Sequence, residues 1–339
     1  MIVRPFSATA ELDRHDGLVR RVLSLSDEQV ATTLADAYAK FVDRRGDLAA
    51  VLEEHFQFVA RGTADLPPLT ADCRRLIGAY YTQEHAIEGA ALTNPSMVLG
   101  PDQSGLDDGA TRFVRSLRAI GEGHLSSIEF RHVQIDRAGN ITIEPTHGHP
   151  QTGAHESVVL DKDDFTQKLT TMGAMDKAAA AIVDQPPDAF EIHHLEAALT
   201  VTEVPSAPCR ATTPATRGMH WLAKSNYKLT FPSATSLDER VVFPWEAVES
   251  NGLEDARFVR FADDDGSTTY YATYTAYDGF RVLPQLIRTD DFITFDVGIL
   301  GGVGAANKGA ALFPRKIDGR YAPSCSNKDI SDATFERWS

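Results

Sequence analysis

The chain has few cysteines, and none of them form a close pair. Only Cys73, Cys209 and Cys325 occur in 339 residues. A disulfide framework needs an even set of cysteines, and a zinc knuckle needs closely paired ones. The sequence therefore predicts neither kind of site.

Long apolar runs and an excess of positive charge are also missing. No stretch approaches the ~18 apolar residues of a membrane span, and the N-terminus, "MIVRPFSATAELDRHDG", lacks the apolar core of a signal peptide. The formal net charge is -15, which disfavours binding to polyanions such as nucleic acid or anionic membrane. We therefore expect a cytoplasmic protein with neither of these partners.

Three familiar catalytic patterns are missing as well. "GGVGAANKG" lacks the Gly-Lys-Ser/Thr ending of a P-loop, and no Gly-x-Ser-x-Gly elbow occurs. His147, His149 and His155 cluster in "THGHPQTGAH", but no cysteine is near and their spacing fits no zinc template. A solvent loop is the favoured interpretation of that stretch, and we predict no metal and no cofactor.

The first ninety residues have the pattern of helices. Ser26 and Gln29 match a capping box that precedes apolar residues at helical spacing. One face of the next stretch is formed by Leu48, Val51, Leu52, His55, Phe56 and Val59. A third helix is expected from about Asp72 to about Leu92, before "TNPS". We therefore predict an N-terminal helical segment over residues 1–90.

Short β-type runs take over from residue 91. They include "TRFVRSLRAI", "LSSIEFRHVQID", "ESVVLD", "YKLTF" and "TTYYATYTAY", with "RAGN" and "DDDGS" as hairpin turns. A helical insertion is expected near 163–199, split by Pro186 and Pro187. Residues 91–339 thus read as a mainly β domain with one helical insertion.

A faint repeat supports a particular β architecture. "TDDFITF" and "SDATFERW" share an acidic start and two aromatic residues three apart, and "DKDDF" resembles an earlier copy. A period of ~40–45 residues made of short strands is the size of one propeller blade. Chance acidic and aromatic pairs are the alternative explanation.

The stretch "GLEDARFVRF" combines charge with a strand pattern. Glu254, Asp255 and Arg257 follow a glycine where a strand begins, and a surface ion pair across a turn is the simplest interpretation. In the strand that follows, hydroxyl-bearing residues alternate onto one face: Tyr271, Thr273, Thr275 and Tyr277. Such a face is typical of a sugar pocket, although Tyr and Thr also favour strands in general.

Taken together, "GLEDARFVRF…YYATYTAYDG" resembles the signature strand pair of glycoside hydrolase family 130. Four other blocks resemble this family in the expected order, so that the likeness covers roughly residues 10–322: "NPSMVLGPDQSG", "SLRAIGEGHLSSIEFR", "SNYKLTFPSATSLDERVVFP" and "NKGAALFPRKIDGRYA". The resemblance implies a five-bladed β-propeller with an N-terminal helical segment. It also implies an inverting enzyme acting on β-mannosides, by phosphorolysis in most members and by hydrolysis in others.

The resemblance assigns the general acid to Asp255. The implied mechanism protonates the glycosidic oxygen through the 3-hydroxyl of the bound mannose. In an extended strand Glu254 and Asp255 point to opposite faces, so only Asp255 is expected to face the pocket, with Arg257 beside it to hold its geometry. The substrate-binding candidates are Asn94, Arg118, Glu122, Glu254, Arg257, Tyr277 and Asp278.

Phosphorolysis further requires fixed cations, because phosphate is an anion. The phosphate-binding candidates are Arg288, Lys308 and Lys316. Two positions depart from the phosphorylase pattern: Asp278 stands where some members carry an arginine, and Phe313 where a histidine is expected. These departures leave open a hydrolase, with Glu239, Glu246, Asp278 or another carboxylate as its base. A noncatalytic carbohydrate-binding or regulatory propeller, inactive for want of its C-terminal blade, is a further alternative. Inorganic phosphate is the expected co-substrate, and a small oligosaccharide the expected partner.

The longer members of the family continue past the last matching block, whereas this sequence stops after "PSCSNKDISDATFERWS". The resemblance therefore leads us to expect a shortened member with an unclosed propeller. An open sheet edge favours association, so a homo-oligomer is a candidate state.

Overall fold

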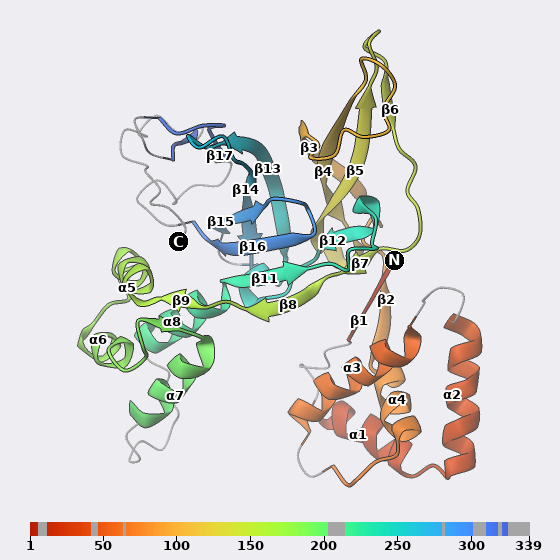
Figure 1. Ribbon diagram of the computed structural model, residues 1–339. Helices are drawn as coiled ribbons and strands as arrows, with labels where there is room; N and C mark the ends of the chain where they lie inside the picture. The colour runs from red at the N-terminus through yellow and green to blue at the C-terminus, as the bar shows by residue number, and fades with distance from the viewer. Residues whose placement is uncertain are drawn as a thin grey trace. The chain divides into compact units, whose positions relative to one another are not determined.

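The computed structural model describes residues 1–5, 12–41, 47–63, 66–202, 214–279, 282–300, 310–317 and 321–324. In these residues the chain contains eight α-helices and a large multi-stranded sheet (Figure 1). None of the described helices has the length and apolar character that a membrane crossing requires. Two compact units divide the chain, residues 1–86 and 87–339.

The first unit is a small helical bundle with a two-stranded sheet. Its elements are β1 (Ile2–Pro5), α1 (Leu12–Leu23), α2 (Asp27–Phe41), α3 (Leu48–Gly62), α4 (Ala71–Tyr80) and β2 (Thr82–His85). The predicted capping box is confirmed, because the Gln29 amide donates to Ser26 Oγ and Gln29 Oε1 accepts from the Ser26 amide. Gly78 lets α4 approach α3 closely, since an added Cβ would lie 1.9 Å from the Leu52 carbonyl oxygen.

The prediction of a helix up to Leu92 is wrong. The α4 helix ends at Tyr80, and the chain then forms β2, a turn and β3 (Ala91–Leu99). Pro95 and its neighbours lie inside β3 rather than beyond the end of a helix. Proline has no amide to donate to a strand ladder, and the strand tolerates it here because the β3–β4 register is irregular between Thr93 and Ser96.

The second unit is built around a sheet of 12 strands in two antiparallel groups. The first group contains β3 (Ala91–Leu99), β4 (Thr111–Ile120), β5 (Ser126–Ile135) and β6 (Ile141–Ile143). The second contains β13 (Gly252–Ala262), β14 (Thr268–Tyr277), β15 (Val282–Thr289), β16 (Thr294–Ile299), β11 (Tyr227–Thr230) and β8 (Ala154–Ser157). One parallel pair, Gly252 with Ser126, joins the groups.

Short strands and 3-10 helices complete the unit. The strands β7 (Gln151–Thr152) and β12 (Arg240–Val242) extend the sheet near β5. Separate pairs are formed by β9 (Leu160–Asp161) with β10 (Ala189–Phe190) and by β17 (Ala311–Leu312) with β18 (Pro323–Ser324). The 3-10 helices are η2 (Glu122–His124), η3 (Leu237–Glu239) and η4 (Ala247–Glu249).

The helical insertion is present and extends past its predicted end. It comprises α5 (Lys162–Thr171), α6 (Lys177–Val183), α7 (Ile192–Thr202) and α8 (Pro214–Lys224). These helices share their own apolar core, which includes Phe165. The "DKDDF" stretch therefore begins a helix and is no copy of a strand motif. The "SDATFERW" stretch lies outside the described residues.

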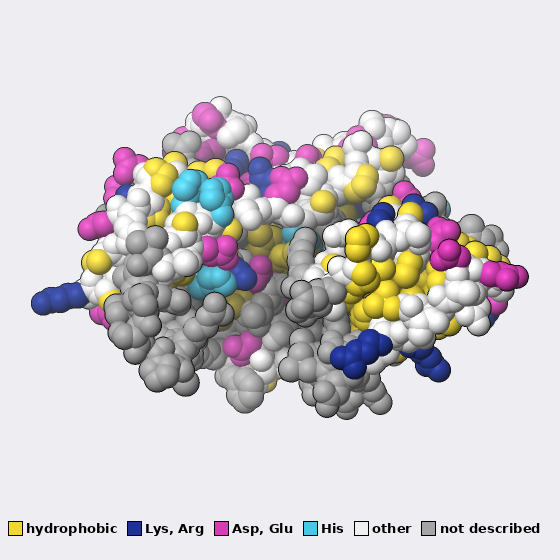
Figure 2. All heavy atoms as spheres, turned by 90° about the horizontal axis from the view of Figure 1, so that it is seen from below, with side chains coloured by type: hydrophobic (Ala, Val, Ile, Leu, Met, Phe, Trp, Pro, Cys, Tyr) yellow, Lys and Arg dark blue, Asp and Glu magenta, His cyan; other side chains and the backbone are white. Residues whose placement is uncertain are grey.

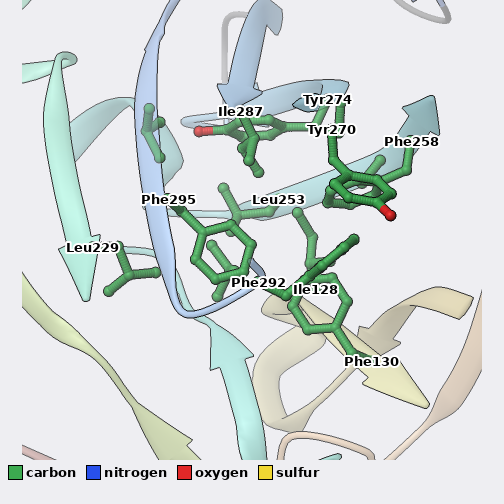
Figure 3. Close-up of a cluster of buried hydrophobic side chains, with 14 of the residues drawn as sticks. Ile128, Phe130, Leu229, Leu253, Phe258, Tyr270, Tyr274, Ile287, Phe292 and Phe295 are labelled. Carbon is green, nitrogen blue, oxygen red and sulfur yellow. The ribbon is translucent and has the colours of Figure 1, made fainter. Parts of the chain in front are cut away.

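The core of the sheet contains side chains from both groups of strands, among them Ile128 and Phe130 from the first and Leu253, Tyr270 and Ile287 from the second (Figure 3). Phe130 from β5 contacts the rings of Phe258, Phe292 and Phe295 at centroid distances of 5.8, 5.7 and 5.7 Å. Aromatic pairs of this kind add stability beyond the area that they bury. This packing fixes β13 against the first group, which positions the site described next.

Candidate functional site

The predicted acid, Asp255, lies in a bulge of β13. Glu254 pairs with Thr275 and Arg257 with Thr273, so β13 has one more residue than β14 over this interval. Asp255 has φ 57°, in the left-handed region that few side chains adopt. A bulge redirects a side chain away from its regular face, and Asp255 is turned in this way out of the ladder.

A second bulge, in β3, brings Asn94 to Asp255. The β3–β4 register shifts between Thr93 and Ser96, and Asn94 has φ 48°. Asn94 Nδ2 donates a hydrogen bond to Asp255 Oδ1, across 161 residues of sequence. Two left-handed residues on strands that are not ladder neighbours therefore meet side chain to side chain.

The guanidinium of Arg118, from β4, completes the cluster. Its Nη2 donates to Glu254 Oε1 at 2.7 Å, and its Nη1 lies 3.8 Å from Asp255 Oδ1. The exposed side-chain fractions are 21% for Arg118, 20% for Glu254 and 34% for Asp255. The structure thus brings Asn94, Arg118, Glu254 and Asp255 together in a cluster that solvent reaches.

The expectation that Glu254 and Asp255 point to opposite faces is wrong, because it assumed an extended chain. The bulge turns both carboxylates to the same guanidinium. Arg257 is exposed, and the register places it on the sheet face of Glu254. The cation beside Asp255 is therefore Arg118, not Arg257.

The remaining predicted substrate residues lie around this cluster. Glu122 is exposed in η2, directly after the strand that carries Arg118. Tyr277 pairs with Gly252 at the start of β13, and its hydroxyl donates to the Gly279 carbonyl at 2.9 Å. Asp278 follows Tyr277 and is half-buried. Their roles as sugar ligands stay predictions.

The Tyr and Thr ladder of β14 alternates as expected, but its hydroxyl face is not an open pocket. Tyr270 and Tyr274 belong to the core of the sheet. On the opposite face Thr273 and Thr275 are also buried, and the Thr273 hydroxyl donates to the Ala310 carbonyl. Ala310, directly before β17, therefore contacts this face.

The two predicted phosphate-binding cations in the described residues, Arg288 and Lys316, have carboxylate partners other than Asp255. Lys316 Nζ lies 2.6 Å from Asp263 Oδ1. Asp263 follows Asp255 by eight positions, which corresponds to roughly 26 Å of extended chain at ~3.3 Å per residue. Arg288 lies on β15, 3.8 Å from oxygens of both Asp290 and Asp296. Lys308 lies outside the described residues.

Two candidate bases and one histidine loop have structural partners. Glu239 accepts from the backbone and hydroxyl of Ser236 at 3.0 and 2.9 Å, and it also accepts from the His149 amide at 3.2 Å. Glu246 is half-buried beside η4. No group of metal-ligand residues is found in the described parts of the chain.

Sequence reasoning missed a buried charge cluster on β5. Glu129 is 2% exposed, and its Oε2 accepts from Arg131 Nη2 at 2.9 Å, while Arg131 also donates to Glu88. Burial, together with the neighbouring Glu88, raises the pKa of Glu129 to about 8. Glu129 and Arg131 are two apart in a strand, which places them on one face and is the signal that could have revealed the pair.

A second buried carboxylate, Glu249, was also missed. Its Oε1 accepts from the hydroxyls of Tyr227 and Tyr274 at 3.0 and 2.7 Å, and its Oε2 accepts from the Trp245 amide at 2.9 Å. Burial raises the pKa of Glu249 above its ordinary value. This carboxylate ties the segment before β13 to β11 and β14, so its contacts indicate a structural role.

No family model and no curated protein matches the chain. Among solved structures, β-1,2-mannobiose phosphorylase from Listeria innocua, in complex with β-1,2-mannobiose, is similar at a TM-score of 0.25 and 14% identity. The match covers 71% of this chain and 62% of that one. The chain thus spans less than two thirds of that structure, and a likeness of this size defines neither its fold nor its activity.

Proposed function

We propose that the protein is a carbohydrate-active enzyme that cleaves β-mannosidic bonds with inversion, by phosphorolysis that gives mannose 1-phosphate. The observation that carries the proposal is the fixed, partly exposed carboxylate of Asp255, held by Asn94 and next to Arg118. Left-handed backbone at a non-glycine residue is typical of functional sites. The sequence resemblance assigns the acid to this same residue.

The geometry suggests how the acid works. Asn94 and Arg118 both contact Oδ1 of Asp255, so we assign the proton transfer to Oδ2. This oxygen gives its proton to the mannose 3-hydroxyl, which passes one to the glycosidic oxygen as the bond to the anomeric carbon breaks. Phosphate then bonds to that carbon from the opposite face. Asn94 and Arg118 keep the carboxyl from rotating.

The proposed architecture is a five-bladed propeller. Its support is the division of the large sheet, because β3–β4–β5–β6 and β13–β14–β15–β16 are each antiparallel groups of consecutive pairings. A four-stranded antiparallel sheet is the unit of a propeller blade. No metal or cofactor is part of the proposed reaction.

Hydrolysis by the same site is the second candidate. The observation that favours it is the engagement of Arg288 and Lys316 by carboxylates away from Asp255. An inverting hydrolase needs a base ~6.5–9.5 Å from its acid, with room for one water. Asp278, close to the start of β13, is the candidate for that base.

The test is incubation with β-linked mannobioses, with and without inorganic phosphate, followed by product analysis. Phosphorolysis predicts α-mannose 1-phosphate only when phosphate is present, and hydrolysis predicts free mannose in both samples. Asp255→Asn keeps the size and backbone preference of the residue and is expected to abolish turnover. Asp264→Asn is the matched control, because Asp264 is 84% exposed on the turn after β13.

Two outcomes contradict the proposal. Full turnover by a folded Asp255→Asn variant removes Asp255 from the chemistry. Sugar binding without either product in the wild type supports a noncatalytic carbohydrate-binding protein instead.

A further inference from the structure

The two bulges of the site must be held in a fixed relation for Asn94 to meet Asp255. The ladder does not do this directly, because β4 and β5 lie between β3 and β13 in the strand order. The pairing of β13 with β5 is confined to Gly252 and Ser126. Past Gly252, the edge of β13 that faces away from β14 depends on other partners.

One side chain supplies such a partner close to both bulges. The Phe258 amide donates to Ser96 Oγ at 3.0 Å, and the same hydroxyl lies 3.5 Å from the Phe258 carbonyl oxygen. The regular register of β3 resumes at Ser96, and that of β13 resumes one residue before Phe258. The contact therefore ties together the ends of the two bulges.

The contact also provides a hydrogen-bond acceptor for the backbone amide of Phe258, which lacks a ladder partner. Phe258 is buried, and its ring packs against Phe130 at 5.8 Å. A buried amide without an acceptor is costly, so the Ser96 hydroxyl takes the place of a missing ladder partner. Further along, Tyr270 Oη donates to the Leu99 carbonyl at 2.8 Å and fixes β3 a second time, away from the bulges.

We propose that Ser96 is a positioning residue of the site: its hydroxyl sets the two bulges against each other so that Asn94 holds Asp255. The bond between Ser96 and Phe258 concerns the fold of the site alone, whereas its effect on catalysis rests on the proposed function. Ser96 itself acts through Asp255 and takes no part in the bond changes.

The first test measures the coupling between Asn94 and Asp255 without any substrate. Asn94→Gly and Asp255→Gly remove the side chains and suit positive φ. A double-mutant cycle on unfolding is expected to show coupling of about fivefold in the unfolding equilibrium constant, the size of one hydrogen bond. In a Ser96→Ala background we expect the coupling to fall below about twofold.

Ser116→Ala is the matched control. Ser116 pairs with Ser96 in the β3–β4 ladder, but its hydroxyl donates to the Ser96 carbonyl at 3.5 Å rather than contacting β13. It should leave the coupling unchanged. Ser96→Thr keeps the hydroxyl, so it should preserve the coupling between Asn94 and Asp255. If the alanine variant does not fold, Ser96→Cys, which keeps the size and weakens the acceptor, replaces it.

The second test uses turnover of β-mannobiose. Ser96→Ala is expected to lower kcat about tenfold with KM within about twofold, because a misplaced acid affects the transition state more than binding. Coupling that persists in the Ser96→Ala background, or an equal loss in Ser116→Ala, overturns the inference. A wild type without turnover overturns the proposed function alone, since the coupling measurement still decides the role of Ser96.

Discussion

The buried carboxyl of Glu129 should make the second unit less stable as the pH rises through neutrality. Burial raises its pKa in the folded protein to about 8, from an ordinary value of 4.5 that applies to the unfolded chain. Between these values the folded state binds the proton and the unfolded state releases it. The free energy of unfolding therefore falls with increasing pH.

The size of the effect follows from the pKa. Linkage for one group with a folded pKa of about 8 gives a loss of about 1.6 kcal/mol between pH 6.5 and pH 8. Burial lowers the pKa values of His132 and His155 below 6.5, and the pKa of Glu88 lies below 4.5, so their contributions change mainly below this window. Glu129 thus dominates the slope among these groups.

The assay compares wild type with Glu129→Gln, which is nearly the same size and does not titrate. The described tryptophans, Trp221 and Trp245, lie in the second unit, so a change in their fluorescence during denaturation reports on that unit. We expect the free energy of unfolding of the wild type to fall by about 1.6 kcal/mol relative to that of Glu129→Gln from pH 6.5 to pH 8. A difference that stays constant within about 0.4 kcal/mol across this window would refute the assigned titration.

Two further predictions concern packing and buried hydrogen bonds. Gly78→Ala should lower the free energy of unfolding of the first unit by about 1–2 kcal/mol, because the clash with the Leu52 backbone exceeds the gain in helix propensity. Gly17→Ala is the control: no atom lies within 4 Å of the added Cβ, so this change should be neutral or stabilising. Hydrogen-exchange protection of α3 and α4 amides measures both, and equal effects of the two changes contradict the prediction. Tyr274→Phe should cost about 1–3 kcal/mol, because the buried oxygens of Glu249 and Gln285 lose the hydroxyl that they contact. Fluorescence-detected denaturation checks this, and an unchanged midpoint argues against it.

Much of the fold could be predicted from local patterns. The capping box at Ser26, the hairpin turns and the alternation of residues along the Tyr and Thr strand depend on neighbours in the sequence, and the structure confirms them. The helix expected to reach Leu92 failed because the residues after Tyr80 pair as strands with distant segments. Pairing of this kind leaves little trace in one stretch of sequence.

The candidate site was predicted in part. Asn94, Arg118, Glu254 and Asp255 were all selected from the sequence, and the structure brings them together. The side-chain directions could not be predicted, because the period-two rule fails at a bulge and neither bulge has a glycine to mark it. Arg257 was therefore placed beside Asp255 in error.

The left-handed backbone at Asp255 limits how this position can change. Branched residues such as Val or Ile are strained there, whereas Asn and Gly are tolerated together with Asp. Replacement of one carboxyl oxygen by an amide group would preserve the fold and remove the acid. Under the proposed function, a single nucleotide change from Asp to Asn at position 255 would therefore remove the catalytic acid while its backbone conformation stays accessible.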